Sequence, residues 1–266
     1  MSSDPGSSCW DLAVSLAVHH AGGNAISAHP VRADIYQVST MSALIAGDYD
    51  GETSYAEVMR HGDFGVGTFN ALDGEMAAVD GDFYHLYADG TVAEVDPVAR
   101  TPFAAVTFFR ADAEIDIDAP HTRTELLALV DATLPSERLF YALRIEGVFT
   151  TVTTRTVARQ TKPYPRLVAA TGSQVEHTYT DIRGTLVGFR APTYAQGTTV
   201  AGYHLHFIAD TRTVGGHALD FGLQSGVVTI DRESDLHVEM PAGRAPPLSG
   251  TAADIAAEIE SAENSR

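Results

Sequence analysis

The sequence contains a single cysteine, Cys9, among its 266 residues. An intrachain disulfide is therefore excluded, and so is a closed structural metal site built from several thiolates. The segment after Met1 also lacks the basic cluster and the long apolar run of a secretory signal. From these absences we expect a protein of the cytoplasm.

Basic residues are scarce as well, because 17 Lys and Arg stand against 35 Asp and Glu and give a formal charge of −18. The field of such a chain repels phosphate backbones, so we expect no nucleic-acid partner. No apolar run approaches the roughly 18 residues of a membrane helix, so we expect no membrane partner. An anionic small substrate would need a local cation or a metal ion to bind against this overall charge.

Histidine is concentrated in one stretch, GYHLHFIADTRTVGGHALD (residues 202–220). Alternate side chains of a strand share a face, so His204 and His206 are predicted to point the same way. The polar run that follows ends in two glycines, a turn signal that would bring His217 back beside the first pair. Three imidazoles that leave a coordination position open are the pattern of a catalytic zinc site.

The rest of the chain favours β structure. Three Asp-Gly pairs predict turns between short antiparallel strands over residues 75–79, 83–87 and 91–95. The aromatic and β-branched stretch over residues 140–157 begins a second sheet, which residues 185–189, 198–208, 218–221 and 226–231 continue.

Helices are predicted at three places with start signals. Ser54 and Glu57 form a capping-box pattern before a short helix over residues 55–61, and Thr122 with Glu125 forms another before a helix that reaches about Leu134. A third start signal stands at residues 251–254, before a C-terminal helix.

These elements predict an α/β fold of the α+β-like kind, with mixed and antiparallel sheets in two sheet-based domains flanked by a few helices. We expect a lead-in over residues 1–30 and an N-terminal mixed-sheet domain over residues 31–138. A C-terminal sheet domain over residues 139–266 would contain the histidine hairpin and the terminal helix.

Four blocks give the chain a recognisable pattern: GVGTFNALDGEMAAVDGDFYHL (65–86), FYALRIEGVFTTVTTRTVARQTKPYP (140–165), YHLHFIADTRTVGGHALDF (203–221) and EIESAE (258–263). With these blocks the sequence resembles the alpha-acetolactate decarboxylase family from about residue 31 to its end. The resemblance implies a carboxy-lyase that converts 2-acetolactate to acetoin and carbon dioxide, on the route to butanediol. It also implies a zinc cofactor and a homodimer.

The resemblance assigns the metal ligands to the three histidines of the hairpin. It places the glutamate of the LDGE block on Glu75 and the arginine of the TTR block on Arg155, both as catalytic residues. The C-terminal catalytic glutamate falls on Glu263, with Glu258 and Glu260 close by, and the threonine of the GTF block falls on Thr68 as a substrate-binding residue.

The chemistry implied for these residues follows from the reaction. Zinc would be chelated by the hydroxyl and ketone oxygens of the substrate and would stabilise the enediolate left by decarboxylation. Arg155 would bind the substrate carboxylate and supply the local cation that the overall charge requires. Glu75 and Glu263 would transfer protons, and no organic cofactor is needed.

Other interpretations fit parts of the pattern. HLHFIAD matches a cupin-like HxHxxxD with Asp210 as a fourth ligand, which would favour iron or manganese in an oxygenase or isomerase. Alternatively, a metal ion on the three histidines would join two strands of a binding module that has no catalytic activity. A zinc hydratase or hydrolase is a further alternative. Without the resemblance, Glu75 is an ordinary acid after a turn and Arg155 a cross-strand partner, and His85 and His177 are taken as ordinary histidines.

Overall fold

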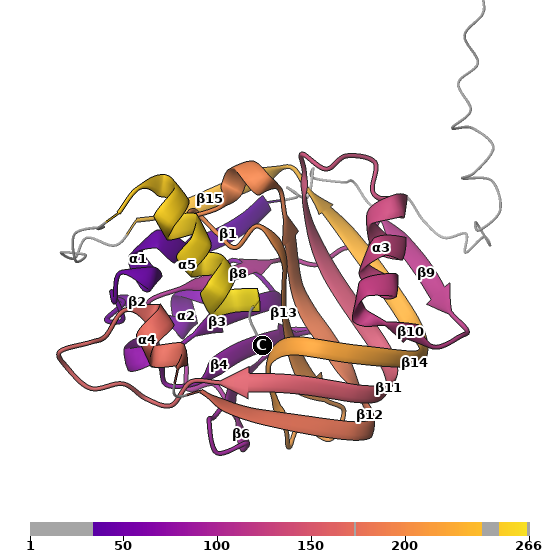
Figure 1. The fold of residues 1–266 in the computed structure, drawn as a ribbon, viewed down its shortest axis with the longest axis horizontal. Coiled ribbons are helices and arrows are strands. Elements are labelled where there is room, and N and C mark those ends of the chain that lie inside the picture. Colours follow the sequence, from indigo (N-terminus) through magenta and orange to yellow (C-terminus); the bar gives the residue numbers. More distant parts are fainter. Residues whose placement is uncertain (1–33, 173, 241–249, 265–266) are drawn as a thin grey trace, which may run out of the picture. The chain divides into compact units, whose positions relative to one another are not determined.

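The computed structural model describes residues 34–172, 174–240 and 250–264, which form two β-sheets flanked by short helices (Figure 1). The predicted fold class, with mixed and antiparallel sheets and few helices, is confirmed. The predicted lead-in over residues 1–30 and the prolines after Met240 lie outside the described residues.

The first sheet has seven strands in the order β15-β1-β8-β3-β4-β5-β6. It is mixed because β1 and β15 run parallel while the other neighbours run antiparallel. Its strands are β1 (Asp34–Val38), β3 (Phe64–Thr68), β4 (Glu75–Val79), β5 (Asp82–Leu86), β6 (Val92–Glu94), β8 (Ala104–Thr107) and β15 (Asp235–Glu239). A separate ribbon pairs β2 (Thr53–Ser54) with β7 (Arg100–Thr101).

The second sheet is antiparallel, with the path β10-β14-β11-β12-β13 and β9 paired to β14. Because β14 also pairs with β13, the strands β11, β12, β13 and β14 close into a ring. The strands are β9 (Ala113–Ile117), β10 (His121–Thr122), β11 (Phe140–Thr156), β12 (Val175–Ala191), β13 (Gly202–Ala209) and β14 (Gly215–Glu233).

Helix α3 (Arg123–Thr133) covers part of this second sheet, and its buried face lies in the same apolar core as the ring of strands. The predicted capping box at its start is confirmed, because Thr122 accepts from the Glu125 backbone while the Glu125 carboxylate accepts from the Thr122 backbone. The box predicted at Ser54 is wrong: its side chain makes no capping bond to α2 (Tyr55–Val58), and Glu57 pairs instead with Arg60 and His61.

The two sheets pack against each other through a shared apolar cluster, in which Phe64 and Val66 of β3 meet Val187 and Phe189 of β12. Chain segments cross between the sheets, since β15 joins the first sheet while β9 and β10 join the second. The division of the chain near residue 138 into separate domains stays a prediction.

Three helices from distant parts of the chain meet beside the sheets. They are α1 (Met41–Ile45), α4 (Leu167–Thr171) and α5 (Ala252–Asn264), and Figure 1 shows α5 running down toward the ends of β11 and β14. Their apolar side chains share one buried cluster with Leu72 of the 3-10 turn Asn70–Leu72 and with Phe103. Another 3-10 turn spans Thr193–Ala195. Within the described part of the chain, no helix has the length and apolarity to span a bilayer.

Candidate active site

The three histidines of the hairpin lie together at one end of the ring of strands. His204 and His206 occupy β13 and point to one face, and His206 stands directly opposite His217 of β14. The ring centroids are 5.1 Å apart for His204 with each of the other two, and 5.4 Å apart for His206 with His217. One nitrogen of each ring lies within 4.8 Å of one nitrogen of both others, and all three residues are buried.

Backbone carbonyls fix how two of these rings face. His206 Nδ1 bonds to the carbonyl of Met76 at 2.7 Å, so its Nε2 faces the centre of the triad, where it has no hydrogen-bond partner among the described residues. His217 Nε2 bonds to the carbonyl of Glu263 at 3.0 Å, which leaves Nδ1 facing the centre. A second nitrogen held by a carbonyl is the usual support of a metal-binding histidine.

The triad is electrically neutral. Burial lowers the pKa of His204 and of His206 to about 3, with Arg155 acting in the same direction, and burial lowers the pKa of His217 well below its usual value. Neutral imidazole is the form that binds metal ions. The donor set and the unpartnered, buried Nε2 of His206 therefore fit a metal ion, and the described residues contain no other cluster of three such groups.

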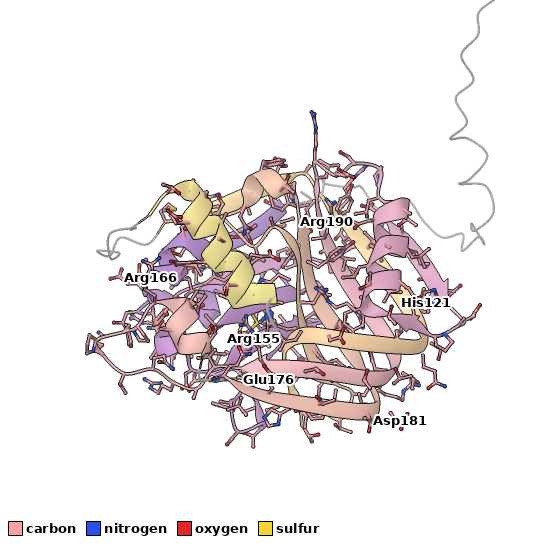
Figure 2. The ribbon with its side chains drawn as sticks, viewed as in Figure 1. His121, Arg155, Arg166, Glu176, Asp181 and Arg190 are labelled. Atoms are coloured by element: carbon pink, nitrogen blue, oxygen red, sulfur yellow. The ribbon has the colours of Figure 1, made fainter. Side chains whose placement is uncertain are left out.

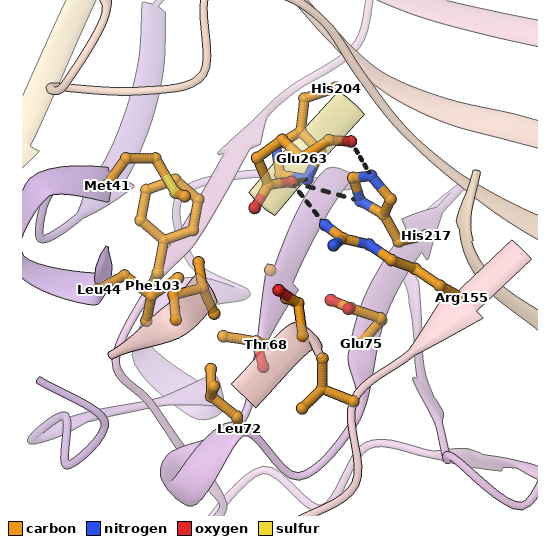
Figure 3. A pocket seen from close by; sticks show the side chains of 14 residues that line it. Met41, Leu44, Thr68, Leu72, Glu75, Phe103, Arg155, His204, His217 and Glu263 are labelled. Carbon is orange, nitrogen blue, oxygen red and sulfur yellow. Dashed lines mark hydrogen bonds and ion pairs between the residues drawn. The ribbon is translucent and has the colours of Figure 1, made fainter. Parts of the chain in front are cut away.

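Arg155 and Glu263 form a buried ion pair next to the triad. Arg155 lies on β11, opposite His217, and its Nη2 is 3.2 Å from Glu263 Oε2. The side chains are only 4% and 8% exposed, respectively. The same oxygen of Glu263 lies 3.7 Å from His204 Nε2 and 3.6 Å from His217 Nδ1. The carboxylate thus faces both the guanidinium and the triad (Figure 3).

Helix α5 places Glu263 there through its own end. The last carbonyls of a helix lack intrahelical donors, and here the carbonyl of Ala262 accepts from Arg155 Nη1 while that of Glu263 accepts from His217. Figure 2 shows Arg155 at the tip of α5, with Asp181 farther along the neighbouring strand β12. The negative end of the α5 dipole therefore points at a cation and at the candidate metal site.

Glu75 approaches the triad from the other sheet. It is the first residue of β4, and its Oε2 lies 3.7 Å from His206 Nε2. Burial raises the pKa of Glu75 to about 8, and Arg155 opposes this rise. Thr68 stands opposite Glu75 in the β3–β4 pairing and donates its hydroxyl proton to the carbonyl of Gly74 at 2.7 Å.

One end of a pocket is polar and is lined by Thr68, Glu75, Arg155, His204, His217 and Glu263. The opposite wall is apolar and comes from the cluster beneath the three helices; it consists of Met41, Leu44, Leu72, Phe103, Val157 and Leu167 (Figure 3). Sequence reasoning did not identify this wall, because the apolar spacing of Met41 and Leu44 marks a buried helix face without showing what lies beneath it. It also missed the carbonyl of Met76, which no side-chain motif reveals.

Several residues considered from the sequence lie elsewhere. Asp210, the fourth ligand of the cupin-like alternative, stands in the turn after β13 and pairs with Arg183 at 3.5 Å, outside the triad. Glu258, the alternative to Glu263, pairs with Arg166 at 2.5 Å. Glu260, the other alternative, is exposed on α5.

Comparison with known proteins gives a consistent result. The family model described as alpha-acetolactate decarboxylase matches residues 35–245. A protein named alpha-acetolactate decarboxylase from Methylococcus capsulatus is 48% identical over 208 residues, which cover 78% of this chain and 80% of that protein. The protein of the same name from Bacillus subtilis is 47% identical over 207 residues, covering 78% of this chain and 81% of that protein.

The fold agrees with the sequence match. The crystal structure of the Bacillus subtilis alpha-acetolactate decarboxylase superposes with a TM-score of 0.85 at 44% identity, covering 87% of this chain and all of that one. The family match ends before α5, so Glu263 is placed at the site by the structure of this chain rather than by that match. The chain belongs to the alpha-acetolactate decarboxylase family.

Proposed function

We propose that this chain decarboxylates 2-acetolactate to acetoin and carbon dioxide, with zinc held by His204, His206 and His217. Membership of the family supports the reaction. The observation that carries the proposal is the polar end of the pocket, where Arg155 and two carboxylates surround a buried, neutral triad of imidazoles. Bound there, zinc would supply a Lewis acid for the negative charge that develops on the ketone oxygen.

Arg155 would bind the carboxylate that leaves. Its guanidinium has five N–H donors, and the bonds to Ala262, Gln174 and Glu263 use three of them. Its Nε is buried and has no partner within the described residues. A permanently charged group with unused donors, held in place by the end of α5, suits a small carboxylate that must bind to a chain of charge −18.

Glu75 and Glu263 would move the protons. When the bond to the carboxylate breaks, carbon dioxide departs and the electron pair passes into the neighbouring ketone, so that one proton must then be added to carbon to give acetoin. The two carboxylates reach the site from different elements, β4 and α5. A proton delivered by only one of them would reach only one face of the enediolate and give a single enantiomer.

The apolar wall and Thr68 would complete the substrate site. The methyl groups of acetolactate need an apolar surface, and the side chains of Met41, Leu44 and Phe103 offer one within the same pocket. The oxygen of Thr68 lines the pocket too and, after donating its proton to Gly74, keeps acceptor capacity for a substrate hydroxyl.

Metal analysis of the purified protein, combined with an acetoin assay on racemic acetolactate, tests this proposal. We expect about one zinc ion per chain and loss of acetoin production after chelation, with recovery when zinc is added back. Acetoin production that is unchanged in fully chelated protein would contradict the proposed role of the triad.

The resemblance also leads us to propose a homodimer in the cytoplasm that has no nucleic-acid or membrane partner. The excess of acidic residues supports the absence of a nucleic-acid partner. Sedimentation equilibrium tests the dimer: a mass near 28.3 kDa, that of one chain, would contradict it.

A further inference from the structure

The turn before Glu75 is held in an unfavourable backbone conformation. Ala71, Leu72 and Gly74 have φ values of 65°, 51° and 87°, in the left-handed region that residues with a Cβ rarely adopt. Strain of this kind persists only where the surrounding structure imposes it, and it is concentrated at functional sites. Glu75, which follows directly, inherits its position from this turn.

The carboxylate of Glu75 has little else to hold it. Among the described residues, its carboxylate approaches His206 Nε2 at 3.7 Å, which is longer than a hydrogen bond. Its placement therefore depends on the backbone from which it extends.

Hydrogen bonds from several directions fix that backbone. The carbonyl of Gly74 accepts from Thr68, and the Gly74 N–H donates to the carbonyl of Leu72 at 2.9 Å and to that of Val157 at 3.2 Å. The carbonyl of Asp73 accepts from His85 Nε2, while the Asp73 carboxylate pairs with Arg159 at 2.9 Å. Among the groups named here, His85 is the one that comes from the neighbouring strand β5.

Two aromatic rings hold the imidazole of His85 in place. Its ring stacks on Phe69 at a centroid distance of 3.5 Å and on Tyr87 at 3.8 Å. Burial lowers the pKa of His85, so the ring is neutral. A carbonyl only accepts, so Nε2 must carry the proton. A Cβ on Gly74 would come within 3.1 Å of this nitrogen, which shows how closely the ring packs on the turn.

We propose that His85 is a positioning residue for Glu75: its Nε2–H holds the carbonyl of Asp73 and thereby fixes the turn from which the Glu75 carboxylate reaches the pocket. The inference deepens the proposed function, on which it rests for its kinetic part. Arg155 and the three histidines lie on β11, β13 and β14 of the other sheet, so we expect the loss of the His85 donor to affect the proton step more than the binding of substrate or metal.

The test compares two substitutions that separate the donor from the stacking. His85→Phe keeps an aromatic ring between Phe69 and Tyr87 but has no N–H, whereas the amide of His85→Gln places a donor near the position of Nε2. We expect His85→Phe to lower kcat by about tenfold to a hundredfold, as a misplacement near 1 Å does. KM and the zinc content should stay within twofold, the enantiomeric excess of the acetoin should fall, and His85→Gln should recover most of the loss.

A readout without substrate tests the same contact. The N–H of Gly74 bonds to the carbonyls of Leu72 and Val157, and its hydrogen exchange should accelerate in His85→Phe but not in His85→Gln. His61→Phe is the matched control, because His61 also stacks on a tyrosine, Tyr36 at 3.8 Å, and does not line the pocket. Its kcat should stay within twofold of the original chain.

The outcomes separate this proposal from the proposed function. Equal loss in His85→Phe and His85→Gln, unchanged kcat in His85→Phe, or loss of zinc from it would each overturn the role of the donor. If His85→Phe does not fold, His85→Asn replaces it in the comparison, since its shorter amide does not reach Asp73. If the original chain makes no acetoin, the proposed function fails, and the exchange rate of Gly74 still decides whether His85 holds the turn.

Discussion

The buried pair of Arg155 and Glu263 gives a quantitative prediction. Substituting Glu263→Gln keeps the shape and one acceptor of the side chain but leaves a guanidinium that is 4% exposed without its counter-ion. At the observed 3.2 Å, two unit charges attract by about 5 kcal/mol at an effective dielectric constant near 20. Since removing one partner of a buried pair costs about 3–5 kcal/mol, we expect a loss of about 3 kcal/mol in the free energy of unfolding.

A double-mutant cycle isolates the pair. Arg155→Met alone should also destabilise, because it leaves the Glu263 carboxylate buried beside three imidazoles. The double variant should be more stable than the sum of the single effects by about 2 kcal/mol, since no charge is then left unpaired. The measurement is urea denaturation of chelated protein, because a bound metal would add its own stabilisation. Additive effects, or a loss below about 1 kcal/mol for Glu263→Gln, would refute the argument that the pair is held in a dry environment.

Three further predictions concern other parts of the molecule. His206→Ala should abolish zinc binding and acetoin production while the circular dichroism spectrum is kept. A steep fall in the melting temperature would instead favour the non-enzymatic binding module in which the histidines join two strands. Glu233 is fully buried, and burial raises its pKa from 4.5 to about 7, so the folded state retains a proton that the unfolded state releases and stability falls as pH rises through that window. Between pH 5 and pH 8 the original chain should therefore lose on the order of 3 kcal/mol of stability that the Glu233→Gln variant does not lose. An identical pH dependence of melting in the two proteins would contradict this. Thr122→Ala should cost about 1 kcal/mol through loss of the capping box of α3, measurable as a lower denaturation midpoint; no change would show that the cap adds nothing beyond packing.

The sequence predicted the local elements where their signals are local. The strands between Asp-Gly turns and the helix after Thr122 follow from turn chemistry and capping, and the structure has them. The hairpin that brings His217 opposite His206 follows from strand alternation and a glycine turn.

The sequence signals underestimate the lengths of the two long strands β12 and β14. β12 begins ten residues before the predicted start at Thr185, because its first half has polar and exposed side chains and is a strand only through its pairing with β11. The strands predicted over residues 218–221 and 226–231 are parts of one strand, β14. Gly222 and Gly226 lie near register shifts against β11 and do not mark a turn.

The parts of the site that depend on distant contacts were not predictable from local patterns. The sequence marks His85 only as an ordinary histidine, since its contacts with Phe69 and Asp73 arise only once β4 and β5 pair. Glu263 was distinguishable from its helical neighbours only through the resemblance, because the contact that singles it out is made across the fold, with Arg155.

The docking of the last turn of α5 onto Arg155 and His217 bears on how the protein is prepared. Any residues fused after Arg266 begin four positions beyond Glu263. An oligohistidine affinity tag at that end would carry additional metal-chelating imidazoles to within a few residues of the triad and would compete with it for zinc. Purification handles for this chain therefore belong at the N-terminus, and metal stoichiometries measured on C-terminally tagged material would overstate the content of the native site.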